Sequence, residues 1–146
     1  MKAVIQRVKR AKVEVEKKII GQIDQGALIF LGVAKNDSYK DADYLVQKII
    51  HLRMFEDKEG KMNLSGLEVG AQFLVVSQFT LYGNCDKGRR PSFDAAATPE
   101  KGKELYDYFI SQLKKQSLKV QTGKFRAMMD VSLINDGPVT FVIESK

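Results

Sequence analysis

The segment Ser77–Gly83, with the sequence SQFTLYG, is the first stretch whose residue types can support chemistry. It follows the apolar run Phe73–Val76, so polar side chains emerge where a buried strand is expected to end. Backbone N–H groups lose their strand partners at such a point and can stabilise a developing oxyanion. A strand that simply emerges into solvent would carry the same residues, and the local pattern taken alone favours that simpler interpretation.

A second segment, Asn135–Phe141, has the sequence NDGPVTF. Asn, Asp and Gly tolerate unusual backbone dihedral angles, which predicts a turn between two strands. Pro138 follows Gly137, and an X–Pro bond can adopt the cis form at modest cost, which redirects the flanking carbonyl groups. Viewed alone, this segment fits an ordinary hairpin turn.

The common catalytic constellations are missing from the sequence. His51 is the only histidine and lies within a predicted helix, with no cysteine or histidine at metal-ligand spacing. Cys85 is the only cysteine, and a Cys-His pair would need His51 to be brought beside it. No phosphate-binding GxxxxGK[ST], GxSxG or HExxH pattern occurs. We therefore expect no metal and no cofactor, and any enzymatic activity must proceed without a conventional triad.

Composition narrows the possible partners and compartments. A hydrophobic fraction of 44% and a charged fraction of 29% predict a globular protein, and 146 residues predict a single domain over residues 1–146. No apolar run approaches the roughly 20 residues of a membrane-spanning helix, so no membrane association is expected. The lone cysteine and the lack of a signal-peptide pattern predict a cytoplasmic location. The net charge of +6 favours a polyanionic partner, although many proteins carry such a charge without binding nucleic acid.

The periodicity of apolar residues predicts an α+β fold. Ser38–Arg53 and a segment that begins at Thr98–Pro99 have helical spacing and helix-start residues, so two main helices are expected. Asp57–Gly60 is expected to close a hairpin. The remaining predicted strands are Lys2–Val8, Val13–Glu16, Ile19–Ile23, Ala27–Val33, Phe73–Val76, Leu118–Thr122, Met128–Ile134 and Val139–Glu144. Two helices packed on curled, barrel-like sheets would accommodate these elements.

Taken together, SQFTLYG and NDGPVTF resemble the hallmark segments of the D-aminoacyl-tRNA deacylase family, SQxxL and a Gly-cis-Pro within NxGPVT. The opening Met1–Arg7, Gly88–Phe93 and Phe125–Met129 also look like family segments, in the family's order. The resemblance covers essentially the full length of the chain.

The resemblance implies a hydrolase that cleaves the ester of D-aminoacyl-tRNA, such as D-Tyr-tRNA, and of mischarged glycyl-tRNA, such as Gly-tRNA(Ala). It also implies a homodimer in which Gly137 and Pro138 of one subunit reach into the active site of the other. Their carbonyl groups would exclude an L side chain, whereas a D side chain points away and glycine has none. The expected partners are aminoacyl-tRNA and a second copy of the chain, with no DNA.

Two mechanisms of ester cleavage remain open. In one, Thr80 is a nucleophile, although no base that would activate its hydroxyl is evident nearby in sequence. In the other, the 2′-OH of the tRNA helps to activate water while the backbone N–H groups of Phe79 and Thr80 hold the oxyanion. The family resemblance favours the second. Ser77 and Gln78 would then orient the amino group and ribose of the substrate.

Three further expectations concern substrate binding. Lys87, Arg89 and Arg90 form a basic loop that would contact acceptor-stem phosphates, or would simply be solvated. Phe125 and Met129 would line the pocket around adenine or the aminoacyl group, or would belong to the core. The rival functions are a non-catalytic RNA-binding module and an editing domain that removes wrong L-amino acids from tRNA.

Overall fold

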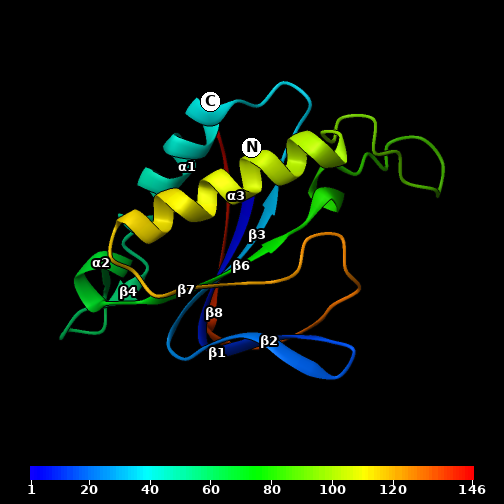
Figure 1. Ribbon diagram of the computed structural model, residues 1–146. Coiled ribbons are helices and arrows are strands. Elements are labelled where there is room, and N and C mark those ends of the chain that lie inside the picture. The colour runs from blue at the N-terminus through cyan, green and yellow to red at the C-terminus, as the bar shows by residue number, and fades with distance from the viewer.

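A six-stranded sheet forms the frame of the molecule, which the computed structural model describes over residues 1–146. Its central strand is β1, which pairs with β8 along one edge and with β3 and then β2 along the other (Figure 1). From β3 the sheet continues through parallel pairing to β6 and then to β7. The strands are β1 (Lys2–Val15), β2 (Lys18–Ile23), β3 (Gly26–Gly32), β6 (Gln72–Ser77), β7 (Val120–Thr122) and β8 (Asp130–Glu144).

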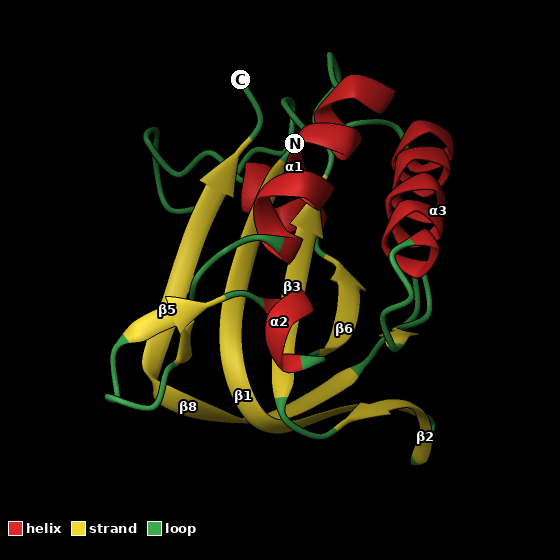
Figure 2. Ribbon diagram, turned by 90° about the vertical axis from the view of Figure 1, so that its left-hand side faces the viewer, coloured by secondary structure: helices red, strands yellow, loops and turns green.

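The sheet curls into a nearly closed barrel, as the sequence predicts. Figure 2 shows β8, β1 and β3 side by side, with β2 lying across the lower end of the sheet. The curl brings β2 against β7: a Cβ atom added at Gly21 would lie 2.5 Å from the carbonyl oxygen of Thr122. Only glycine permits this close approach of the two backbones.

The two predicted helices are present as α1 (Tyr39–Ile50) and α3 (Pro99–Lys115). Asp41 accepts a hydrogen bond from the backbone N–H of Ser38 at 2.8 Å, which confirms the predicted helix start. Thr98 caps α3 by accepting from the N–H of Lys101. A third, short helix that was not predicted, α2 (Gly66–Val69), begins after Ser65, whose side chain and that of Glu68 form a complete capping box.

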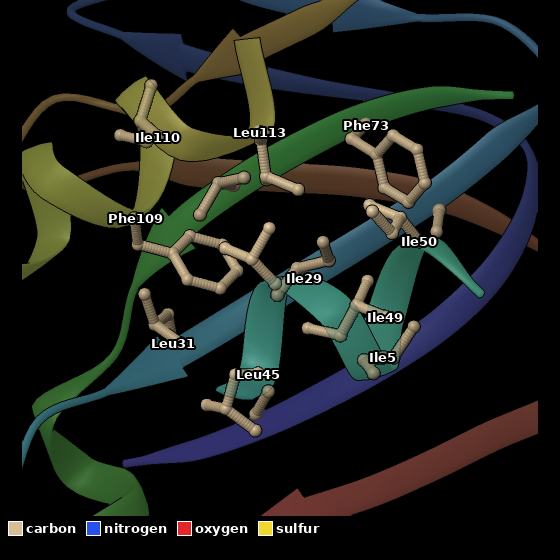
Figure 3. Packing of buried hydrophobic residues seen from close by; sticks show 14 of the residues in the cluster. Ile5, Ile29, Leu31, Leu45, Ile49, Ile50, Phe73, Phe109, Ile110 and Leu113 are labelled. Carbon is tan, nitrogen blue, oxygen red and sulfur yellow. The ribbon is translucent and has the colours of Figure 1, made fainter. Parts of the chain in front are cut away.

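The main core lies between these helices and one face of the sheet. Figure 3 shows Phe109 and Leu113 of α3 and Leu45 of α1 pointing toward the strands, where they meet side chains of β1, β3 and β6. β3 is buried along almost its whole length, as expected for a strand with apolar residues on both faces. A second cluster, which includes Val8, Leu28 and Leu74, fills the interior of the curled sheet.

Two pairs of predicted strands each proved to be one continuous strand. Lys2–Val8 and Val13–Glu16 belong to one 14-residue strand, β1, and the two predicted closing strands belong to one 15-residue strand, β8. Both halves of β8 pair with β1 in the same antiparallel direction, so NDGPVTF does not reverse the chain. The extra residues are accommodated as a bulge, because Val8 pairs with Asn135 and Gln6 with Thr140.

The predicted hairpin is present between two short strands, β4 (Phe55–Glu56) and β5 (Met62–Leu64). The side chain of Asp57 accepts hydrogen bonds from the backbone N–H groups of Glu59 and Lys61, which fixes the turn. In the whole structure, no helix has the length and apolar character needed to cross a membrane.

Candidate functional site

A cavity of about 650 Å³ opens where β6 ends. The end of β6, the first turn of α3 and the loop between β7 and β8 form its walls, and apolar side chains cover most of them. Such a recess favours an uncharged or aromatic group and uses its few polar groups to orient it.

Residues of two separate segments that the sequence analysis selected meet in this cavity. Ser77, Gln78 and Phe79 come from the end of β6, and Phe125 and Met129 come from the loop between β7 and β8. Thr80 does not line the cavity. It lies one residue further along, in a 3-10 turn, η1 (Phe79–Tyr82), that the sequence did not predict.

The hydrogen bonding of the backbone changes at the edge of the cavity, from strand pairing to a 3-10 turn. The N–H of Gln78 still donates to the carbonyl of Leu31 on β3, at 2.8 Å. The next two N–H groups, of Phe79 and Thr80, begin η1, where helical geometry provides no carbonyl partner within the turn. The side-chain amide of Gln78 donates to the hydroxyl oxygen of Thr80. The segment therefore presents backbone donors beside the cavity, and the Thr80 hydroxyl is engaged by an amide N–H, which is not a base.

The cavity contains almost no titratable side chains. Arg126 is the only ionisable residue in its lining, which includes no histidine, cysteine, aspartate or glutamate. Tyr106 lies just behind the wall, where its hydroxyl donates to the carbonyl of Val75 at 2.8 Å, and burial raises the pKa of that hydroxyl. Its ring packs against Phe125 at 5.8 Å between centroids. A general base from this chain is therefore absent from the cavity wall.

Several lining residues were not singled out individually from the sequence. Phe93 packs edge-on against Phe79 with 4.9 Å between ring centroids, and both are substantially exposed at the cavity mouth. Met128 lines the cavity with 92% of its surface exposed. These residues lie in loops without periodicity, where the only signal is an apolar side chain in an otherwise polar segment.

Gly137 and Pro138 lie apart from this cavity. They are absent from its lining, and they form the exposed crest of the bulge in β8. The peptide bond between them is cis. A Cβ atom added at Gly137 would lie 2.2 Å from the backbone nitrogen of Val139, so this conformation of the bulge accepts only glycine there.

A buried arginine holds the base of the bulge. Arg7 of β1 is 5% exposed, and its guanidinium donates to the carbonyl oxygens of Asp136 at 2.8 Å and Met54 at 2.7 Å. Carboxylates of Glu56 and Asp136 lie 3.4 and 3.6 Å from it. Sequence reasoning missed this role, although Ala3, Ile5 and Arg7 alternate onto the same face of β1 as the core. A charged residue at a core-facing position was the available signal.

The predicted basic loop projects away from the sheet. Lys87, Arg89 and Arg90 are exposed and do not line the cavity. Two backbone hydrogen bonds between Asn84 and Ser92, of 2.7 and 2.9 Å, close the base of the loop. Figure 1 shows the loop extending beyond the N-terminal end of α3, the end that borders the cavity.

A curled sheet, helices on one face, and an apolar cavity with backbone donors at its edge define a small α+β domain with a single recessed candidate site at the end of β6. A family model described as D-Tyr-tRNA(Tyr) deacylase matches residues 4–144. The chain belongs to the D-aminoacyl-tRNA deacylase family, as the resemblance of its segments indicated.

Individual relatives agree with this assignment. The chain is 57% identical over 146 residues to a D-aminoacyl-tRNA deacylase of Thermosipho africanus, covering 100% of this chain and 98% of the relative. It is 58% identical to one of Desulfatibacillum aliphaticivorans, with complete coverage of both.

Two solved structures are also similar to the chain. One, described as c-Myc DNA Unwinding Element Binding Protein, has a TM-score of 0.94 and 41% identity, covering 100% of this chain and 99% of that one. The second, described as a probable eukaryotic D-amino acid tRNA deacylase, is 17% identical with a TM-score of 0.86, covers 98% of both chains, and supports the fold alone.

Proposed function

We propose that this protein hydrolyses the ester between a D-amino acid and the 3′-terminal ribose of tRNA, and that it also removes glycine from mischarged tRNA. The observation that carries the proposal is the family match over residues 4–144, together with a cavity built from Ser77–Phe79 and Phe125–Met129. The relatives carry the name D-aminoacyl-tRNA deacylase, which describes the first of these two reactions.

The cavity fits the end of an aminoacyl-tRNA. Phe125, Met129 and their apolar neighbours provide the surface for adenine or the aminoacyl group, while Ser77 and Gln78 orient the ribose and the amino group. The exposed cations Lys87, Arg89 and Arg90 bind acceptor-stem phosphates, an interaction that depends on charge more than on geometry.

In the proposed mechanism, the chain supplies the oxyanion site and the substrate supplies the base. Water attacks the ester carbonyl while the 2′-OH of the terminal ribose accepts a proton from the water and passes its own proton to the 3′ oxygen. The N–H groups of Phe79 and Thr80 stabilise the tetrahedral oxyanion, which collapses as the bond to the 3′ oxygen breaks and releases the amino acid and the tRNA. The absence of a titratable base from the cavity wall supports this scheme. The bond from Gln78 to the Thr80 hydroxyl supports it as well, because an amide N–H cannot deprotonate that hydroxyl. An aminoacyl ester is already activated, so positioning contributes much of the rate.

The proposed chiral filter requires a second copy of the chain. Gly137 and Pro138 are exposed and lie outside the cavity of their own chain, so a partner must present them to it. Their carbonyl groups would then meet an L side chain, whereas a D side chain or the hydrogen of glycine would not collide. The outer edge of β8 has no strand partner within the chain, which leaves it open for such pairing.

The decisive experiment is a comparison of D-Tyr-tRNA, L-Tyr-tRNA and Gly-tRNA(Ala) as substrates, with release of the amino acid followed over time. We expect hydrolysis of the D-aminoacyl and glycyl esters and little hydrolysis of the L ester. Failure to hydrolyse any of them would refute the enzymatic proposal. Equal rates on D- and L-Tyr-tRNA would refute the chiral filter and favour a general editing enzyme.

Nucleic-acid binding without catalysis is a second candidate, favoured by the similarity to the 41% identical c-Myc DNA Unwinding Element Binding Protein. The net charge of +6 is compatible with it. Binding of duplex DNA and of uncharged tRNA at matched salt concentration separates the two, because a deacylase should prefer the tRNA acceptor end. Tight DNA binding without release of any amino acid would favour the second candidate.

A further inference from the structure

Asn135 occupies an unusual place at the base of the bulge in β8. Its side-chain oxygen accepts a hydrogen bond from the N–H of Val139 at 2.9 Å, and its side-chain nitrogen donates to the carbonyl of Val139 at 3.0 Å. A weaker contact of 3.4 Å joins the same nitrogen to the hydroxyl of Thr140. One side chain therefore satisfies both backbone groups of Val139.

These two bonds replace the missing partner strand. β1 pairs with Asn135 through Val8 and with Thr140 through Gln6, and it provides no partner for the residues between them. The amide of Asn135 takes the place of a neighbouring peptide group and closes a ring around Asp136, Gly137 and Pro138. Val139 itself is 8% exposed, so the ring is fixed to the main core at one end.

Arg7 and Asn135 hold different parts of the bulge. Arg7 fixes the entry to the bulge through the carbonyl of Asp136, while Asn135 fixes its exit through Val139. Gly137 and Pro138 lie between these two attachment points and project outward, exposed. Arg7 and Asn135 therefore set the direction in which the crest points, although neither side chain is part of the crest.

We propose that Asn135 is a positioning residue that determines how strictly the protein rejects L-aminoacyl-tRNA, without contacting the substrate. The inference rests on the chiral filter proposed above. An exclusion surface works only while it stays in place, because a shift of about an ångström makes room for a side chain that would otherwise collide. Loosening the crest should therefore raise hydrolysis of the L ester, while the D ester, which points away, reacts at nearly the same rate.

The sharpest test replaces Asn135 by aspartate and compares the ratio of D- to L-Tyr-tRNA hydrolysis with that of the wild type. At about pH 7.5 the new carboxylate still accepts from the Val139 N–H, but its second oxygen faces the Val139 carbonyl and repels it. We expect the D-to-L ratio to fall at least about tenfold, with the rate on the D ester nearly unchanged.

Three charged groups surround the substituted position: Asp136 adjoins it, the Arg7 guanidinium binds the carbonyl of Asp136, and Glu56 lies on the far side of Arg7. Asn36→Asp is the matched control, because it makes the same change at an exposed position outside the bulge. It should leave the ratio at the wild-type value. An Asn135→Asp ratio that equals the wild-type ratio would overturn the inference and leave the proposed function intact.

A measurement on the wild-type protein keeps the inference testable if the variant does not fold. The Val139 N–H should exchange with solvent deuterium as slowly as strand amides, because Asn135 holds it, although β1 does not pair with it. Exchange as fast as that of an exposed loop amide would overturn the inference. Because this readout needs no substrate, it is independent of whether the deacylase proposal survives.

Discussion

The cavity at the end of β6 and the bulge in β8 differ in how they use backbone groups. At the cavity, the N–H groups of Phe79 and Thr80 begin a short turn, where the turn itself provides them with no carbonyl partner. At the bulge, side chains of Arg7 and Asn135 engage the backbone of Asp136 and Val139. An oxyanion site needs donors kept available, whereas an exclusion surface needs backbone that cannot move. The two regions match the opposite needs of the two roles proposed for them.

The largest expected effect concerns the cavity, because it contains no base of its own. If the 2′-OH of the substrate assists the attacking water, replacing the terminal ribose with 2′-deoxyribose should slow cleavage by about 10² or more. Single-turnover rates with D-Tyr-tRNA and its 2′-deoxy counterpart measure this directly. An unchanged rate would require a base from the protein, which the cavity wall does not show.

The bulge should be most sensitive at Gly137. An added methyl group would lie 2.2 Å from the Val139 nitrogen, so Gly137→Ala must displace the crest. We expect the preference for D- over L-Tyr-tRNA to fall by about tenfold or more, because the exclusion surface moves. Parallel kcat/KM measurements on both esters separate this loss of selectivity from a general loss of activity. An equal loss on both esters would contradict the role of the bulge in excluding L substrates.

Mixing two variants tests whether the bulge and the cavity come from different subunits. Gly137→Ala damages only the bulge, and Gln78→Ala damages only the cavity. In a mixed dimer, the intact cavity of the first chain faces the intact bulge of the second, so selective D-specific hydrolysis should reappear. If the mixture behaves as the sum of the two separate proteins, the shared site is excluded.

Arg7 should affect both stability and selectivity. Arg7→Met keeps much of the side chain's volume but leaves the carbonyls of Asp136 and Met54 without their donor, which should cost about 1–3 kcal/mol of the free energy of unfolding. Selectivity should fall along with it, since the entry to the bulge loosens. Denaturant unfolding gives the first quantity and the D-to-L ratio gives the second. A loss of stability with unchanged selectivity would make Arg7 purely structural.

The basic loop should contribute to affinity alone. Arg89→Ala/Arg90→Ala should raise KM with kcat unchanged, and should reduce the dependence of log K on log salt by roughly 1.5 to 2. Lys114→Ala/Lys115→Ala is the matched control, because it removes the same charge at the C-terminal end of α3, away from the cavity. Equal effects of both pairs would indicate that only net charge matters.

The sequence predicted best where local rules decide the outcome. The caps at Ser38 and Thr98 and the burial of β3 follow from side-chain chemistry and from periodicity, and the structure shows all three. The continuity of β8 was mispredicted, because Asn, Asp, Gly and Pro have the same turn propensity in a hairpin and in a bulge. Only the length of β1, which pairs with both halves, distinguishes the two. Tertiary pairing is not visible in a local window.

The candidate site shows the same difference between features that local sequence patterns predict and features that depend on tertiary structure. The two groups Ser77–Phe79 and Phe125–Met129 are separated by about a third of the chain yet line one cavity, and the family resemblance indicated this grouping where periodicity did not. Arg7 and Asn135 were missed as supports because their partners are backbone groups, and a sequence does not display where backbone groups are left unpaired.

The smallest expected effect is that of Thr80→Val, which, compared with Thr80→Pro, separates the side chain from the backbone at one position. Thr80→Val keeps the branched shape and the N–H but removes the hydroxyl, so D-Tyr-tRNA hydrolysis should stay within about threefold of wild type if the backbone carries the oxyanion. Thr80→Pro instead removes the N–H and should cost about 10² in kcat. Circular dichroism and thermal unfolding of both variants show whether the fold is intact. A large loss for Thr80→Val with the fold intact would identify the hydroxyl as the nucleophile, and the cavity would then depend on a side chain, as the bulge does.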